Sequence, residues 1–243
     1  KYNPDGTKEW TKLLGSPEDD RASALTTGSD GSIYIAGNTE GDLDGENNNG
    51  FMDAFISKYN PDGTKEWTKL LGSPDDESGE ALTVGSDGLI YIAGTITGFG
   101  EIDGQTISGT KDAFISKFNL DGTKEWTKLL GSDSIEGASA ITSGSDGSIY
   151  VAGYTAGDLD GLANSGGRDV FISKYDSDGT KEWIKLLGSN TLVEGSTLTA
   201  GSDRSIYIAG ITTTGGDLDG QKNSGDIDAF VMKLIETIAP EDL

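Results

Sequence analysis

Three segments of the sequence carry acidic and amide side chains at one repeated spacing. In each segment an Asp, a second Asp, an Asn and a third Asp stand at positions 1, 3, 7 and 12. The residues are Asp42, Asp44, Asn48 and Asp53; Asp158, Asp160, Asn164 and Asp169; and Asp217, Asp219, Asn223 and Asp228. Oxygen ligands at alternate positions, completed by an acidic residue at position 12, are typical of calcium-binding loops. The spacing therefore predicts three calcium (Ca²⁺) sites.

A second interpretation of the same residues stays open. The glycine of each segment stands at position 4 instead of 6, so the loops are not EF-hands. Asp and Asn also stabilise turns by binding their own backbone, without any metal. A fourth segment has Glu101, Asp103 and Asp112, but Ile107 replaces the asparagine. We expect that segment to bind calcium weakly or not at all.

The segments belong to a repeat that runs along the chain. The four tryptophans, Trp10, Trp67, Trp126 and Trp183, are 57, 59 and 57 residues apart, each within KEWTKLLG or KEWIKLLG. The phrases GSDGSIYIAG and DAFISK, with small variations, recur four times in the same order. Repeats of this length indicate a solenoid or a propeller.

Each copy of the repeat reads as two hairpins. In the first copy the predicted strands are 24–27, 33–36, 54–59 and 65–71, joined by turns at Ser29-Asp30-Gly31 and Pro61-Asp62-Gly63. The second strand is apolar without alternation, which indicates that both of its faces are covered. We therefore predict an all-β fold, a β-propeller with four blades of four antiparallel strands.

The ends of the chain predict how the ring closes. The sequence opens with an outermost strand around Trp10 and ends with the third strand of the last copy, around Phe230. Pairing of the N-terminal with the C-terminal strand would complete the fourth blade and leave no open edge. We therefore expect one propeller domain over residues 1–234, with residues 235–243 as a C-terminal linker. Since the chain begins at Lys1, we also expect it to be part of a longer chain or assembly.

These phrases resemble the bacterial beta-propeller repeat family, often abbreviated SBBP. GSDGSIYIAG, GDLDG…DAFISKY and NPDGTKEWTKLLG carry the resemblance, which covers residues 1–234. They look most like versions from large surface or secreted proteins of cyanobacteria. The resemblance implies a propeller, usually extracellular or on the cell surface and usually without a known activity.

Composition narrows the function classes. The net charge of −23 disfavours nucleic acid and anionic lipid as partners. Without histidine or cysteine, zinc and copper sites and the usual nucleophile–base pairs of enzymes are missing. No stretch of the sequence is long and apolar enough for membrane insertion.

Three functions stay open. The first is a non-catalytic extracellular binding or scaffold module, for adhesion or protein interaction, that binds a protein or glycan through its acidic loops and is stabilised by calcium. The second is a calcium-assisted, lectin-like glycan-binding propeller. The third is a carboxylate-dependent glycoside hydrolase, which the recurrence of the acidic residues with the repeat disfavours. We predict that the chain is not an enzyme.

Overall fold

The computed structural model describes residues 1–235, which form seventeen strands and no helix. The predicted linker at 235–243 lies outside the described residues from position 236 onward, and Ile235 is the last residue of strand β17. The fold is all-β, as predicted from the sequence. Every named strand pair is antiparallel.

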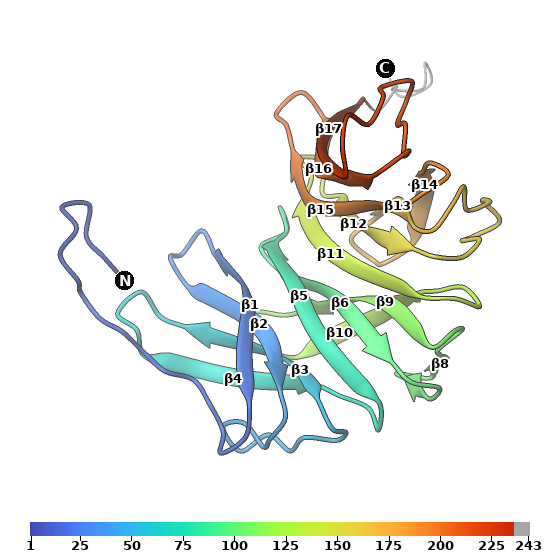
Figure 1. The fold of residues 1–243 in the computed structure, drawn as a ribbon. Coiled ribbons are helices and arrows are strands. Elements are labelled where there is room, and N and C mark those ends of the chain that lie inside the picture. The colour runs from blue at the N-terminus through green and yellow to red at the C-terminus, as the bar shows by residue number, and fades with distance from the viewer. Residues whose placement is uncertain (236–243) are drawn as a thin grey trace.

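The strands form four large sheets, here called blades, that follow one another along the chain (Figure 1). The first blade comprises β1 (Asp20–Thr27), β2 (Ile33–Thr39), β3 (Asp53–Tyr59) and β4 (Lys65–Leu71). The second comprises β5 (Asp76–Val84), β6 (Ile90–Thr97), β9 (Lys111–Phe118) and β10 (Lys124–Leu130). The third comprises β11 (Glu136–Ser143), β12 (Ile149–Thr155), β13 (Asp169–Tyr175) and β14 (Lys181–Leu187). The fourth comprises β15 (Val193–Ala200), β16 (Ser205–Thr213) and β17 (Ile227–Ile235). A fifth, small sheet pairs β7 (Glu101–Ile102) with β8 (Gln105–Thr106) in the β6–β9 loop.

A glycine in the second strand of each blade lies opposite a bulge in the first strand. The first strand bulges at the same place in every blade, for example between Ala22 and Ala24. Opposite the bulge, a Cβ atom on Gly37 would lie 1.9 Å from the carbonyl oxygen of Arg21, and the equivalent glycines of the other three blades show the same distance. No side chain fits in that space, which explains the glycine of the repeated phrase IYIAG.

The core lies between the blades. The third strands of the first three blades are buried throughout or almost throughout their length. Tyr34 and Ile56 of the first blade pack with Ile92 and Phe114 of the second in one apolar cluster, and similar clusters join the later blades. Each blade is therefore stabilised chiefly by its neighbours.

The predicted closure of the ring by the N- and C-terminal strands is wrong for this structure. In Figure 1 the N-terminal segment lies beside the first blade and β17 lies at the far end of the arc. The Trp10 indole donates a hydrogen bond to the Pro61 carbonyl (3.4 Å) in the first blade. Trp67 makes the equivalent bond to Leu120 of the second blade (3.1 Å). Residues 8–14 thus take the place of an outer strand that precedes the first blade, and within residues 1–235 the fourth blade has three strands.

Candidate functional site: the acidic loop face

The long loops gather on one face of the arc. The loop between the first and second blades contacts the β2–β3 loop on one side, where a Cβ on Gly50 would meet the Asp75 carbonyl oxygen. On the other side the Asp75 carboxylate accepts hydrogen bonds from the amides of Phe99 (3.4 Å) and Gly100 (2.7 Å) in the β6–β9 loop. Loops that are distant in the sequence therefore form a continuous surface, here called the loop face.

The first aspartate of each predicted calcium segment closes its own loop. Asp42 accepts a hydrogen bond from the Asn48 amide at 2.9 Å, and Asp158 and Asp217 do the same for Asn164 (2.9 Å) and Asn223 (3.2 Å). The three asparagine side chains in turn donate to the carbonyls of Thr39, Thr155 and Thr212. These bonds are the turn chemistry that the second interpretation describes.

The second aspartate of each segment occupies the tip of a tight hairpin. Asp44 and Gly45 both have positive φ, 57° and 88°, and Leu43 pairs with Glu46 across them. Two successive residues with positive φ define a type I′ turn, for which Asp-Gly is a preferred pair. The same geometry recurs at Asp103, Asp160 and Asp219. The Asp-Gly dipeptide was the sequence signal for these hairpins, and the search for metal-ligand spacing missed it.

The carboxylates at these tips face the outer strand of their blade. Asp44 forms an ion pair with Lys65, Asp103 with Lys124 (2.6 Å), and Asp160 with Lys181 (2.8 Å). Partial burial alone would raise the pKa of Asp44, but hydrogen bonds from Lys65 and Thr68, together with the lysine charge, outweigh it and hold this pKa below its usual range. The leucine before Asp44 is fully buried, so the tip is fixed to the blade from both sides.

The last aspartate of each segment lies at the start of the third strand of its blade, as the first residue of β3 and β13 and as the second residue of β9 and β17. Asp53, Asp112 and Asp169 are fully buried. Asp53 accepts a hydrogen bond from the Asn49 amide (3.0 Å), and a Cβ on Gly72 would collide with its carboxylate. Burial raises the pKa of Asp53 and of Asp112.

The four predicted ligands of one loop do not converge in the described structure. The first binds a loop amide, the second a lysine, and the last lies buried at the start of a strand. Within residues 1–235, no group of three or more acidic side chains has a geometry that could hold a metal ion. As folded, these residues do not form a preassembled calcium site. Calcium binding stays a prediction from the sequence.

A buried glutamate lies where the loop between two blades meets the second blade. Glu77 is fully buried, and its carboxylate accepts hydrogen bonds from both the amide (3.0 Å) and the hydroxyl of Ser73. Burial, with added repulsion from Asp53 and Asp75, raises the pKa of Glu77 to about 7. Glu136 takes the same place in the next blade and accepts three hydrogen bonds, from the Ser132 amide and hydroxyl and from Thr155.

Two exposed phenylalanines stand on the loop face. Phe51 in the β2–β3 loop is 67% exposed, and Phe99 in the β6–β9 loop is 80% exposed. They flank the loop that holds Asp75 between them. Neither residue recurs in the other repeats. The repeated fold therefore does not require these two exposed aromatic side chains.

Solved structures with a similar arrangement have low sequence identity. A catalytically inactive virginiamycin B lyase from Staphylococcus aureus aligns with 90% of this chain and 58% of its own, at 20% identity and a TM-score of 0.48. A protein of unknown function from Bacteroides caccae aligns with 84% of this chain and 61% of its own, at 10% identity and a TM-score of 0.45.

Two curated proteins are related in sequence. The regulatory protein FlaEY of Caulobacter vibrioides is 32% identical over 168 residues, 63% of this chain. An uncharacterized WD repeat-containing protein of Acanthamoeba polyphaga mimivirus is 22% identical over 260 residues. The alignments span 18% and 19% of the lengths of these relatives. Residues 9–44 match the family model described as SBBP, Beta-propeller repeat, and the chain therefore carries the repeat of that family.

Proposed function

We propose that this chain is a non-catalytic binding or scaffold module of an extracellular or cell-surface protein, and that the loop face is its contact surface. The exposed pair Phe51 and Phe99 carries the proposal. Large exposed apolar side chains that the repeat does not require are typical of contact surfaces. The surrounding acidic loops favour a partner with a basic, partly apolar surface.

The state of the carboxylates supports a non-catalytic role. An acid or base in catalysis needs a carboxylate that is free to exchange a proton with a substrate. On this face Asp42 binds a loop amide, Asp44 binds Lys65, and Asp53 is buried, with the same arrangement in the third blade. These groups stabilise the loops, and their repetition follows from the repeated fold. Within residues 1–235, no helix is long and apolar enough to cross a membrane.

Selection from a phage-displayed random peptide library tests the proposal. The immobilised chain should enrich peptides that combine Lys or Arg with an apolar anchor. The double substitution Phe51→Ala and Phe99→Ala should abolish the enrichment, because it removes the apolar contact and keeps the charge. Leu162→Ala is the matched control, since Leu162 is a partly exposed apolar residue (37%) on the loop of the third blade. Enrichment that survives the double substitution contradicts the proposed surface.

The glycan-binding alternative has its own test. A glycan array probed with the chain in calcium and in chelator should show no binding under the proposal. Calcium-dependent binding that requires Asp42 or Asp158 would replace the protein-contact function with the lectin-like one.

A further inference from the structure

The contact surface proposed above carries a carboxylate between its two phenylalanines. We propose that Phe51, Asp75 and Phe99 together bind an arginine side chain of the partner protein. The flat guanidinium group would stack on a phenylalanine ring and donate hydrogen bonds to the Asp75 carboxylate. This inference rests on the proposed function and adds to it the chemistry of the side chain that the partner inserts.

The loop that carries Asp75 contacts the loops of both phenylalanines. A Cβ on Gly50, the residue before Phe51, would collide with the Asp75 carbonyl oxygen. On the other side, the Asp75 carboxylate accepts hydrogen bonds from the amides of Phe99 (3.4 Å) and Gly100 (2.7 Å). The backbone of Asp75 is therefore fixed to one phenylalanine loop and its carboxylate to the other.

Two glycines leave the space in which the Asp75 carboxylate lies. A Cβ on Gly98 or on Gly100 would collide with this carboxylate, so neither position accepts a side chain without a shift. The two glycines stand directly before and after Phe99 in the sequence. The charge is thus positioned beside an exposed aromatic residue before any partner binds, which lowers the cost of ordering the site.

The repeat does not require this combination of residues. The positions equivalent to Asp75, counted from the serine that begins each loop between blades, hold Glu18, Ser134 and Thr191. The loop with Phe99 lies in the tryptophan spacing of 59 residues, whereas the other two spacings are 57. Within residues 1–235, only the junction of the first and second blades combines exposed phenylalanines with a carboxylate between them.

Asp75 has no cationic partner in the described part of the chain. The hairpin-tip residues Asp44, Asp103 and Asp160 pair with lysines of their own blades. Within residues 1–235, no lysine or arginine forms an ion pair with Asp75. Its two amide hydrogen bonds leave acceptor capacity, because a carboxylate has about four lone-pair sites. A cation from a partner can therefore pair with Asp75 without displacing a lysine of the chain itself.

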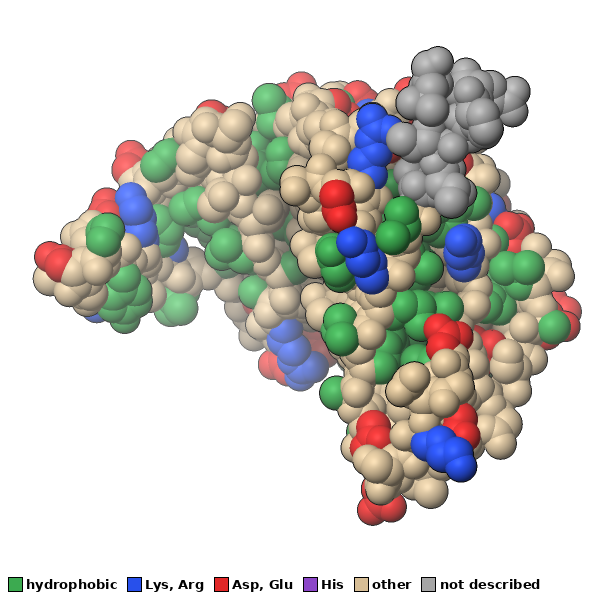
Figure 2. Space-filling model, turned by 90° about the horizontal axis from the view of Figure 1, so that it is seen from above, with side chains coloured by type: hydrophobic (Ala, Val, Ile, Leu, Met, Phe, Trp, Pro, Cys, Tyr) green, Lys and Arg blue, Asp and Glu red, His purple; other side chains and the backbone are tan. Residues whose placement is uncertain are grey.

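The charge of the whole chain favours the approach of a basic partner. The sequence has 41 acidic and 18 basic residues. On the face seen in Figure 2, Lys and Arg side chains lie singly, and several lie beside Asp or Glu. An excess of negative charge attracts a basic partner before contact and leaves the final position to local groups such as Asp75.

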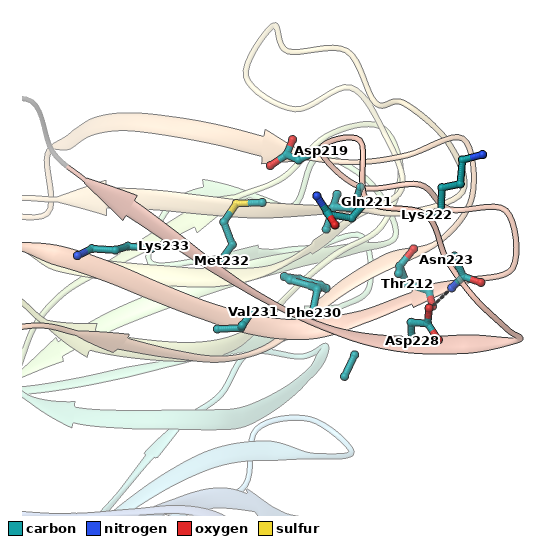
Figure 3. A pocket seen from close by; sticks show the side chains of 12 residues that line it. Thr212, Asp219, Gln221, Lys222, Asn223, Asp228, Phe230, Val231, Met232 and Lys233 are labelled. Atoms are coloured by element: carbon teal, nitrogen blue, oxygen red, sulfur yellow. Dashed lines mark hydrogen bonds between the residues drawn. The ribbon is translucent and has the colours of Figure 1, made fainter.

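The hollow beside β17 lacks this preference for a cation. It has a volume of about 310 Å³, and its lining includes Asp219 and Asp228 but also Lys222 and Lys233 (Figure 3). The positive charges offset the negative ones there. The hollow therefore does not favour a basic ligand by its charge, whereas the surface around Asp75 does.

The side-chain chemistry favours arginine over lysine at this surface. A guanidinium group is planar, so it can lie on an aromatic ring while its edge donates bidentate hydrogen bonds to a carboxylate. The ammonium group of lysine is compact and strongly hydrated, and it lacks a flat face. Exposed rings on both sides of a carboxylate therefore fit arginine better.

An NMR titration of the isotope-labelled chain with three short peptides tests the proposal. The peptides have the sequence Ala-Leu-Xaa-Leu-Ala with blocked ends, where Xaa is arginine, lysine or citrulline, the uncharged analogue of arginine. We expect the arginine peptide to bind about tenfold more tightly than either of the other two. Binding should shift the amide resonances of Phe99 and Gly100, which donate to Asp75.

Variants of the chain separate the charge from the rings. Asp75→Asn should remove the preference for arginine over citrulline, because it removes the charge and keeps a carbonyl oxygen for the two amides. Asp133→Asn, an exposed residue in the equivalent loop of the next junction, is the matched control and should keep that preference. Phe51→Leu combined with Phe99→Leu keeps the surface apolar and should reduce the preference for arginine over lysine, since leucine has no ring for stacking. Thermal melting checks that each variant is folded.

The outcomes distinguish this inference from the proposed function. Equal binding of the three peptides at the Phe51 and Phe99 surface would overturn the arginine site and leave the proposed contact function intact. An arginine preference that survives Asp75→Asn would also overturn it. If none of the three peptides binds, the proposed function is contradicted and the arginine site with it.

Discussion

The free energy of unfolding of the Glu77→Gln variant, relative to that of the wild-type chain, should rise from acidic to neutral pH. Burial raises the pKa of Glu77 to about 7, against 4.5 for an exposed glutamate. A raised acid pKa means that the folded state binds more protons than the unfolded state between these two values. The contribution of Glu77 to the free energy of unfolding is therefore largest below pH 4.5 and is lost as the pH rises toward 7.

The size of the effect follows from the same two values. One pKa unit corresponds to about 1.4 kcal/mol, so full ionisation of Glu77 costs the folded state up to ~3 kcal/mol. The glutamine keeps a carbonyl oxygen for the Ser73 amide and never ionises. The difference between Glu77→Gln and wild type should therefore grow by about 1–3 kcal/mol between pH 4.5 and pH 8.

Urea denaturation followed by tryptophan fluorescence at pH 4.5, 6 and 8 measures this difference directly. Glu101→Gln, on an exposed side chain in the β6–β9 loop, controls for the loss of one negative charge. Comparison of variants at each pH cancels the titration of the other carboxylates. A difference that stays constant from pH 4.5 to 8 would refute the assignment of Glu77 as a buried carboxyl that ionises at a cost.

Four further predictions concern two turns, the strand bulge and the acidic loops. Arg204 has a φ of 62° where the first three repeats have glycine, so Arg204→Gly should raise the free energy of unfolding by about 1 kcal/mol in chemical denaturation, and no gain would exclude a strained turn. Gly45→Ala should cost about 1 kcal/mol, because the residue has a φ of 88° in open space. Gly37→Ala should cost several times more, because its Cβ would meet the backbone of Arg21; equal costs would contradict the described bulge. If hydrogen bonds and ion pairs alone close the acidic loops, calcium and magnesium at equal ionic strength should raise the melting temperature equally; an extra rise in calcium would establish the sites predicted from the sequence.

Much of the fold could be predicted because the same strand and turn signals occur in four copies of the repeat. The tryptophan spacing and the turns at Gly31 and Gly63 indicated four antiparallel strands per copy, and three blades have them. The equivalent turn of the fourth copy keeps this conformation at Arg204, although the glycine of the first three copies is absent there. Ring closure could not be predicted, because the local sequence specifies which strand fits beside β17 but not which segment supplies that strand.

The loops show why spacing alone did not determine the chemistry. Asp42, Asp44 and Asp53 have the residue types of calcium ligands, and the same types build Asx turns, type I′ hairpins and buried strand starts. Position in a repeat does not give the direction of a side chain. The lysine opposite Asp44 lies 21 residues away in sequence and meets it only when β4 pairs with β3.

The four blades form an open arc in which residues 8–14 and β17 do not meet within one copy of the chain (Figure 1). The chain has no cysteine, so Asp5→Cys and Ser202→Cys place two spin labels at unique positions. These residues lie in the turns that closure within one copy would bring together, as the turns at Gly31 and Pro61 meet in the first blade. Pulsed dipolar spectroscopy, with the labelled protein diluted into unlabelled protein, reports only the distance within one copy. We expect a long distance that spans the arc; a short distance, typical of neighbouring turns in one sheet, would contradict the open arrangement.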